Sequence, residues 1–319
     1  MKISQRLALA AGILAAAGLS ISAQAETRIT YKSAKSTSSY YQMAVQLAEA
    51  IKKGTNGNVI LTVEESQGSV QNVKEAARRG GNYVFTTPPV LVKLAMKGVK
   101  MFKPKNPAYD KIRGLFPIPS LTMHFVVRKD AGVTTFGDLA GKTFLIGKGS
   151  FGAREAAKYF KKFGLDGKVK LAKVELNAAV NALKNRQIDG FATAGSYPAP
   201  NVMEAAASTA IDVLSLSDDM IKATGRDKLV IPAGTYKGVD HDVQTTTLPV
   251  MAYTTTAMDN DTAYLLTKTY WEQKARLGQQ AAWWKGVSPD YLKAMVGKLH
   301  PGAVKYYEEK GIAVPAALK

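Results

Sequence analysis

The residues best suited to chemistry in this sequence lie in short segments rich in hydroxyl groups and glycine, each between a strand-like and a helix-like stretch. Five segments of this kind are KSAKSTSSYY, SQGSVQN, FTTPP, GKGSFGA and TAGSYPAPN. Such residues favour helix starts, where unpaired backbone N–H groups and a partial positive charge suit an anion. One such junction is ordinary helix capping, but five in one chain predict a cleft that holds a small anion.

The first of these segments leads into the clearest helix of the chain, residues 40–51. Tyr40, Leu47 and Ile51 recur at helical spacing and predict a buried stripe. Tyr41 lies off this stripe, so its phenol either stands over the cleft or packs between two domains.

The sequence lacks the residue patterns of the common enzyme and metal-binding classes. It has three widely spaced histidines and no cysteine, which leaves no metal-ligand cluster, disulfide or thiol nucleophile. It contains no P-loop, no G-x-G-x-x-G and no G-x-S-x-G motif. Asp189 is the one acid that could support an enzyme hypothesis. We prefer the interpretation that it is an ordinary polar residue at the start of a strand. We therefore expect a binding protein that is not an enzyme and has no cofactor or metal.

The elements that position these segments alternate between strand and helix along the chain. Strand-like stretches occupy residues 58–66, 82–87, 125–130, 143–149 and 190–195. A helical pattern or a turn follows each of them, which predicts an α/β fold with mostly parallel sheets and helices on both faces. A length of 319 residues suggests two domains.

The first 25 residues have the pattern of a secretory signal peptide. Lys2 and Arg6 precede an apolar run, and the small residues AQA end at Ala25, where we expect cleavage. The run is short for a membrane anchor, and a lipoprotein anchor would need a cysteine. We therefore expect a periplasmic protein.

The chain is basic, with a formal net charge of +18, which falls to +16 when Lys2 and Arg6 leave with the signal peptide. Its lysines are scattered and it has no arginine-rich tract. Because the chain is also expected to be exported, solvated surfaces explain the charge better than a nucleic-acid partner. A basic surface still attracts small anions at low ionic strength.

Several long segments resemble the TAXI family, the solute-binding proteins of one branch of tripartite ATP-independent periplasmic (TRAP) transporters. The similarity covers nearly the whole mature chain and rests on YYQMAVQLAEAI, GSVQNVKEAARRGGNYVFTT, FGDLAGKTFLIGKGSFGAR, LKNRQIDGFATAGSYPAPNVMEAA and VIPAGTYKGVDHDVQTTTLPVMAYTT. It implies a bilobed periplasmic-binding-protein fold of the type II-like class, with two crossover strands. Lobe 1 would comprise residues 26–118 and 248–319, and lobe 2 residues 119–247.

The resemblance also implies a function. The expected ligand is a small organic anion, a carboxylate such as an amino acid, a keto acid or another organic acid. Closure of the lobes would capture it, and a monomeric receptor would deliver it to the membrane subunits of a TRAP permease. The alternative is a periplasmic sensor or adaptor that presents its ligand to a membrane sensor kinase, since both kinds of protein use lobe closure.

Matching the family's motifs residue by residue implies a set of ligand-binding positions. They are Ser36, Thr37, Tyr40, Tyr41, Gly68, Ser69, Asn72, Thr86, Thr87, Gly149, Ser150, Phe151, Gly152, Gly195, Ser196, Tyr197 and Pro198. Where the family often has a Gly-Ser-Gly-Thr-like turn, this chain has Ser150, Phe151, Gly152 and Ala153. The change removes two hydroxyl groups and adds a phenyl ring, which predicts a less polar acid unless Phe151 packs beneath the turn.

A carboxylate clamp would be supplied most effectively by an arginine, because its guanidinium group can donate two parallel hydrogen bonds. Arg113 and Arg154 are the two candidates for this role. The alternative for each is a solvated surface charge.

Overall fold

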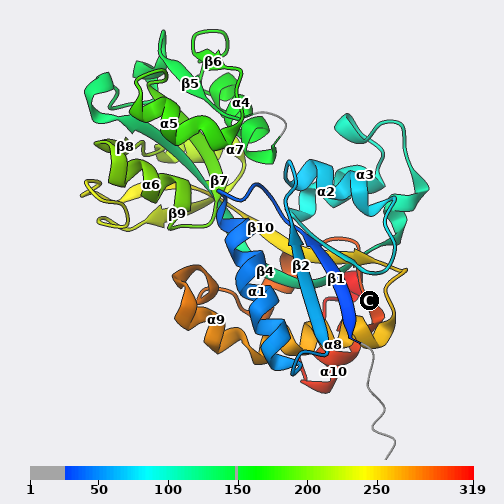
Figure 1. The fold of residues 1–319 in the computed structure, drawn as a ribbon. Helices are drawn as coiled ribbons and strands as arrows, with labels where there is room; N and C mark the ends of the chain where they lie inside the picture. The colour runs from blue at the N-terminus through cyan, green and yellow to red at the C-terminus, as the bar shows by residue number, and fades with distance from the viewer. Residues whose placement is uncertain (1–25, 148–149) are drawn as a thin grey trace, which may run out of the picture.

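The computed structural model describes residues 26–147 and 150–319, which form two lobes of mixed α/β structure (Figure 1). Its strands belong to one curled sheet with the order β2-β1-β3-β10-β4-β7-β5-β6. Three short strands pair outside this path: β8 and β11 with β4, and β9 with β10. The bilobed α/β architecture expected from the sequence is therefore present.

The first lobe contains both the amino-terminal and the carboxy-terminal segments of the chain (Figure 1). Its strands are β1 (Thr27–Lys32), β2 (Val59–Glu64), β3 (Tyr83–Thr87) and β11 (Lys298–Leu299). Its helices are α1 (Ser39–Gly54), α2 (Ser69–Ala76), α3 (Pro89–Met96), α8 (Asn260–Glu272), α9 (Lys274–Gln280) and α10 (Pro301–Glu309). The strand β1 pairs in parallel with β2 and β3, and α1 packs against β2 and α8.

The second lobe repeats the alternation of strands and helices. Its strands are β5 (Thr143–Leu145), β6 (Lys170–Ala172), β7 (Gly190–Gly195), β8 (Ile211–Val213) and β9 (Asp227–Ile231). Its helices are α4 (Phe151–Lys162), α5 (Ala179–Lys184), α6 (Pro200–Ser208) and α7 (Asp218–Thr224).

Short 3-10 helices occur in both lobes. They cover Lys100–Phe102, Pro107–Lys111, Lys129–Ala131, Gly137–Leu139, Leu176–Ala178, Ala282–Trp284, Pro289–Ala294 and Ala316–Leu318.

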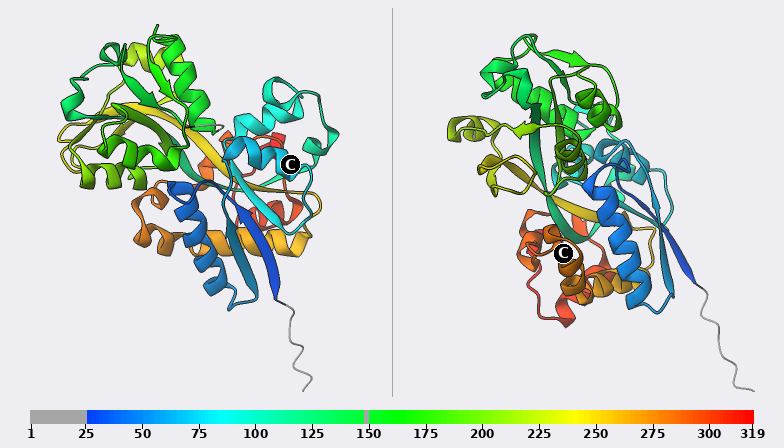
Figure 2. Two further views of the ribbon diagram at one scale, coloured as in Figure 1. Left: turned by 45° about the horizontal axis from the view of Figure 1, so that its top comes forward. Right: turned by 60° about the vertical axis from the view of Figure 1, so that its left-hand side comes forward.

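Two long antiparallel strands, β4 (Ile112–Arg128) and β10 (Val243–Thr255), run from one lobe into the other (Figures 1 and 2). The ladder between them shifts register between Leu248 and Val250. Pro249 lies at that shift, and it has no N–H group to donate. The proposed lobe boundaries, 118/119 and 247/248, fall inside these two strands.

The strand β4 is the main difference between the expected and the observed elements. The sequence indicated a strand only over residues 125–130, whereas β4 begins at Ile112. Pro117 and Pro119 interrupt the strand pattern of the sequence because proline is rare inside sheets. Here pairing with β10 on one side, and with β7 along the distal half, holds the chain extended.

Other expectations agree closely with the structure. The strand β7 spans residues 190–195 as predicted, and Tyr40, Leu47 and Ile51 are buried on one side of α1. The sequence LNAAVNALKNRQID predicts a helix over residues 176–189, but the structure has a shorter one there, a 3-10 turn followed by α5. The expected signal peptide lies outside the described residues. Across residues 26–147 and 150–319, no helix combines the length and the apolarity needed to cross a membrane.

Candidate functional site

The starts of three helices from both lobes meet at one cavity, which we call the interlobe cavity. It is lined by Ala34, Lys35, Ser38, Tyr40, Gln67, Gly68, Ser69, Leu121, Ile146, Ser150, Phe151, Gly152, Glu175, Leu176, Ala192, Thr193 and Ala194. Lobe 1 contributes the starts of α1 and α2, and lobe 2 contributes the start of α4. These are three of the five junctions that the sequence marked out.

The three helix starts differ in how their backbone N–H groups are satisfied. Ser38 Oγ accepts a hydrogen bond from the backbone N–H of Tyr41 at 3.2 Å, and Ser150 Oγ accepts one from Ala153 at 3.0 Å. The helix α2 follows Gly68, whose φ of 103° is accessible mainly to glycine, and no described side chain caps it. The first N–H groups of α2 are therefore available to an external acceptor.

The charges around the interlobe cavity are few. Among the lining residues that the structure describes, Lys35 is the one cationic side chain and Glu175 is the one anionic side chain. The partial positive charges of the α1, α2 and α4 amino termini add to that of Lys35. Lobe 1 thus presents a cation and two helix starts, whereas lobe 2 presents one helix start and a carboxylate.

The loop between β1 and α1 already binds a carboxylate of the protein itself. The backbone N–H of Ser36 donates to Glu65 Oε1 at 2.6 Å. Hydrogen bonds from the Ser36 side chain and backbone hold the pKa of Glu65 below its ordinary value. Ser36 is therefore engaged outside the interlobe cavity, and it does not line that cavity.

Tyr40, rather than Tyr41, lines the interlobe cavity. Its phenol oxygen donates to the backbone carbonyl of Pro119 at 3.0 Å, where α1 meets the crossover strand β4. Burial raises the pKa of Tyr40 well above its ordinary value, so the hydroxyl group remains a donor at neutral pH. Tyr41 is half-buried and is not among the residues that line this cavity, so a role for its phenol over the cleft stays a prediction.

The floor of the interlobe cavity comes from the strands β4 and β7. Leu121 of β4 and Ala192 and Ala194 of β7 line it. Side chains alternate along a strand, so the neighbours of Leu121 point to the opposite face. Ser120 and Thr122 accordingly line a different pocket, which we call the rear cavity.

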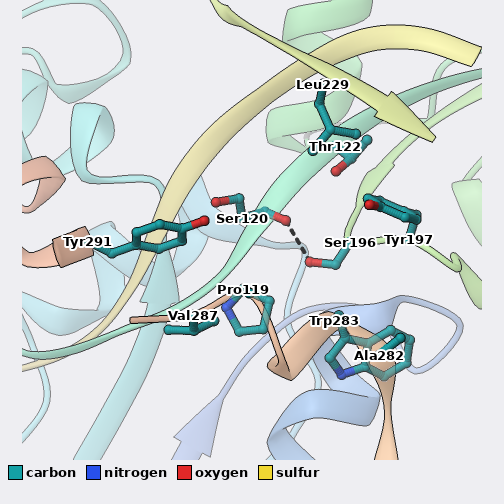
Figure 3. Close-up of a pocket in the computed structure, with 11 residues that line it drawn as sticks. Pro119, Ser120, Thr122, Ser196, Tyr197, Leu229, Ala282, Trp283, Val287 and Tyr291 are labelled. Carbon is teal, nitrogen blue, oxygen red and sulfur yellow. Dashed lines mark hydrogen bonds between the residues drawn. The ribbon is translucent and has the colours of Figure 1, made fainter. Parts of the chain in front are cut away.

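The rear cavity lies between the second-lobe loop after β7 and the segment that follows α9 (Figure 3). It is lined by Pro119, Ser120, Thr122, Ser196, Tyr197, Leu229, Ala282, Trp283, Gly286, Val287 and Tyr291. Ser196 Oγ donates to the backbone carbonyl of Ser120 at 2.6 Å, the bond drawn in Figure 3. Ser196 and Tyr197 therefore line the rear cavity and are not among the lining residues of the interlobe cavity.

Six of the positions implied by the family resemblance line the interlobe cavity: Tyr40, Gly68, Ser69, Ser150, Phe151 and Gly152. Ten others do not: Ser36, Thr37, Tyr41, Asn72, Thr86, Thr87, Gly195, Pro198, and the rear-cavity residues Ser196 and Tyr197. The predicted position Gly149 lies outside the described residues.

Two of the predicted positions that do not line the cavity stabilise the structure of lobe 1 instead. The buried side chain of Asn72 donates to the backbone carbonyls of Ser33 at 2.7 Å and Thr86 at 2.9 Å. The hydroxyl groups of Thr86 and Tyr31 are hydrogen-bonded at 2.8 Å. These contacts join α2 to the ends of β1 and β3, so Asn72 and Thr86 position the loops that form the cavity.

Neither candidate arginine lines the interlobe cavity. Arg113 lies at the start of β4, where its Nη1 donates to the backbone carbonyls of Asp110 and Ile112 at 2.9 and 2.8 Å. These bonds engage Nη1 of the guanidinium group with the backbone, and a role of Arg113 as a carboxylate clamp stays a prediction. Arg154, in the first turn of α4, lines a neighbouring pocket together with Lys74 of α2 and Arg78, which follows that helix.

Glu175 and Leu176 are lining residues that the sequence reasoning missed. They follow β6 in the segment AKVELNAAV, which has neither glycine nor a hydroxyl group. The rule that ligands bind beyond the carboxyl ends of parallel strands was the available signal. Within the described parts of the chain, no cluster of acidic residues and histidines is arranged to hold a metal ion.

Comparison with known proteins identifies the family and agrees with the fold. A family model described as the NMT1-like family matches residues 32–311. MatC from Rhodopseudomonas palustris, solved with bound malate, aligns with a TM-score of 0.57 at 9% identity over 89% of this chain and 96% of its own. The periplasmic binding protein BugD aligns with a TM-score of 0.54 at 12% identity over 90% and 99%. The chain therefore belongs to the NMT1-like family and has the bilobed fold of periplasmic solute-binding proteins.

Proposed function

We propose that this protein is an extracytoplasmic solute receptor that captures a small organic anion in the interlobe cavity. The observation that carries this proposal is the convergence of the α1, α2 and α4 amino termini, from both lobes, on one cavity. A carboxylate there would accept hydrogen bonds from the first N–H groups of α2, which no described side chain caps.

The surroundings of the cavity favour an anion over a cation. Lys35 lines the cavity, and Lys74, Arg78 and Arg154 line the adjacent pocket between α2 and α4. Glu75 is the one acid of that pocket, and its carboxylate binds Lys32 at 3.0 Å and Arg79 at 3.2 Å. The basic groups at the cleft would therefore raise the local concentration of small anions.

The two-lobed shape provides a means of capture. The lining residues come from both lobes, and β4 and β10 connect these lobes (Figure 2). Closure about the crossover strands would bring the start of α4 toward the starts of α1 and α2 and exclude water from the anion. Helix dipoles and N–H groups act more strongly on a charge that has lost its water.

The TAXI-like segments of the sequence support a finer assignment. In this proposal the signal peptide is cleaved after Ala25, the mature protein is a periplasmic monomer, and it delivers its ligand to the membrane subunits of a TRAP permease. The malate in MatC, a protein of the same fold, is consistent with a carboxylate ligand. The proposed role involves binding and release without chemical conversion.

The proposal is tested by thermal unfolding of the mature protein with a panel of amino acids, keto acids, dicarboxylates, aliphatic acids and aromatic acids. A true ligand at a hundredfold excess over its dissociation constant should add about 2.7 kcal/mol to the free energy of unfolding. The amide of each acid serves as the neutral control. A panel without any shift would contradict the proposal, and uptake through a reconstituted permease would separate transport from sensing.

A further inference from the structure

We infer that the ligand is a monocarboxylate with an aliphatic or aromatic body, and that dicarboxylates are disfavoured. This inference rests on the proposed function because it concerns the ligand of the same interlobe cavity. It follows from the separation of polar and apolar groups in the cavity wall and from the position of one acidic side chain.

The groups that can hold a negative charge belong to the loops and first turns of helices. Lys35 and Ser38 lie at the start of α1, Ser69 is the first residue of α2, and Ser150 precedes α4. These positions can satisfy one carboxylate with N–H, O–H and ammonium donors. The described lining contains no arginine that could clamp a second carboxylate.

The strand-derived floor of the cavity offers almost no donors. Leu121 and Ala192 are only 3% and 2% exposed, and Ile146 lies directly after β5. Thr193 is the polar residue of the floor; its Oγ1 accepts a hydrogen bond from Asn201 Nδ2 at 3.0 Å, so its O–H is the one side-chain donor there. A carboxylate pressed against this floor would lose water and gain at most this one donor, whereas a hydrocarbon chain would gain from burial.

Phe151 and Leu176 extend the apolar surface along the lobe-2 wall. Phe151 is the first residue of α4 and lines the cavity although it is 6% exposed. Leu176 is half-buried at the start of a 3-10 turn. Together with the floor they can surround a short chain or a ring, and each further buried methylene would strengthen binding about fourfold.

Glu175 places a negative charge in the same wall. Its side chain is half-buried, and none of the described residues forms an ion pair or a side-chain hydrogen bond with it. A second carboxylate on the ligand would meet this like charge in a partly desolvated site. Glu175 therefore acts as the group that selects against dianions.

The test compares hexanoate, adipate and hexanamide by titration calorimetry with the mature protein. Hexanoate and adipate have the same carbon chain and differ by one carboxylate, and hexanamide removes the charge. We expect hexanoate and phenylpropionate to bind, adipate to bind at least tenfold more weakly, and hexanamide to show no binding. Adipate binding as tightly as hexanoate would overturn this inference and leave the proposed function intact. If every acid of the wider panel failed as well, the proposed function itself would fall.

Two variants sharpen the comparison. Glu175→Gln should strengthen adipate binding at least threefold more than it strengthens hexanoate binding, and Leu176→Ala should weaken hexanoate binding threefold or more. Glu204→Gln is the matched control, because Glu204 is an exposed acid on α6 that does not line the cavity. An unchanged adipate affinity in Glu175→Gln would overturn the role of Glu175, and circular dichroism would establish that each variant is folded.

Discussion

Ser39 and Ser196 lie 157 positions apart in the sequence and are joined by a buried hydrogen bond, in which the backbone N–H of Ser196 donates to Ser39 Oγ at 2.9 Å. This bond ties the start of α1 in lobe 1 to the loop after β7 in lobe 2. Gly195 packs so closely against Ser39 that an added Cβ atom would lie 2.5 Å from its Oγ. The small residues of the loop thus permit the two lobes to meet beside the crossover strands.

The first prediction concerns this contact. Gly195→Ala should lower the free energy of unfolding by about 1–3 kcal/mol, because the new methyl group overlaps Ser39 Oγ. Ser39→Ala should cost about 1–3 kcal/mol because it leaves the buried Ser196 N–H without its acceptor. In the double variant the methyl group no longer meets a hydroxyl, so the combined loss should be smaller than the sum. Urea denaturation of the four proteins measures this coupling, and simple additivity would contradict the close contact.

The second prediction concerns ligand binding at α2. Ser69→Ala should weaken binding of the cognate carboxylate by about tenfold to a hundredfold, because a hydrogen bond to a charged group is worth roughly 1.5–3 kcal/mol. Tyr41→Ala, which changes a neighbouring α1 side chain outside the cavity lining, should alter affinity less than twofold. Calorimetric titration provides the measurement. A large loss for Tyr41→Ala with none for Ser69→Ala would place the site on another face of α1.

The third prediction concerns Asp189, the acid that first suggested an enzyme. Its Oδ1 accepts from Arg128 Nη2 at 3.0 Å and its Oδ2 accepts from the backbone N–H of Thr143 at 2.8 Å, which links β4, β5 and β7. Asp189→Ala should lower the free energy of unfolding by about 3 kcal/mol, because Arg128 is buried and loses a charged partner.

Asp130→Ala is the matched control for Asp189, because Asp130 binds the same arginine but is largely exposed. This substitution should cost less than about 1 kcal/mol. Guanidinium denaturation compares the two variants. Equal losses would show that the β4–β7 linkage is not the source of the stability.

The fourth prediction is a dependence of stability on acid pH. Burial lowers the pKa of His124 from 6.5 to about 4, and its Nε2 is hydrogen-bonded to the Tyr236 hydroxyl at 2.8 Å. Between pH 6.5 and 4 the unfolded chain binds the proton that the folded protein excludes, so the free energy of unfolding falls as the pH falls. His124 alone should account for a loss of about 3 kcal/mol across this window.

Urea denaturation at several pH values tests this prediction in the His124→Gln variant. The substitution should reduce the stability at pH 7 and flatten its decline toward pH 4. His241 provides a contrast of opposite sign, because its hydrogen bond to Asp212 raises its pKa and stabilises the folded protein at acid pH. His241→Asn should therefore steepen the decline, and an unchanged slope in His124→Gln would be inconsistent with a neutral buried His124.

Local sequence patterns predicted well those elements whose conformation depends mainly on residues nearby in the sequence. Hydrophobic spacing placed α1, and the apolar run GFATAG predicted β7 at its observed bounds. The extent of β4 could not be predicted, because the extended conformation of Pro117 and Pro119 depends on pairing with distant segments. The same distinction applies to the site. The sequence identified the five junctions but did not show which of them line the same cavity.

By itself the sequence determined that this chain is an α/β protein with several helix starts suited to an anion, because capping and periodicity are local properties. Only the tertiary structure decided that the α1, α2 and α4 starts share one cavity, while Ser196 and Tyr197 line another. The physical reason is the alternation of side chains along β4, which directs Leu121 to one face and Ser120 and Thr122 to the other. Which face of β4 borders which cavity depends on how β4 pairs with β10 and β7. These pairings join residues more than 60 positions apart.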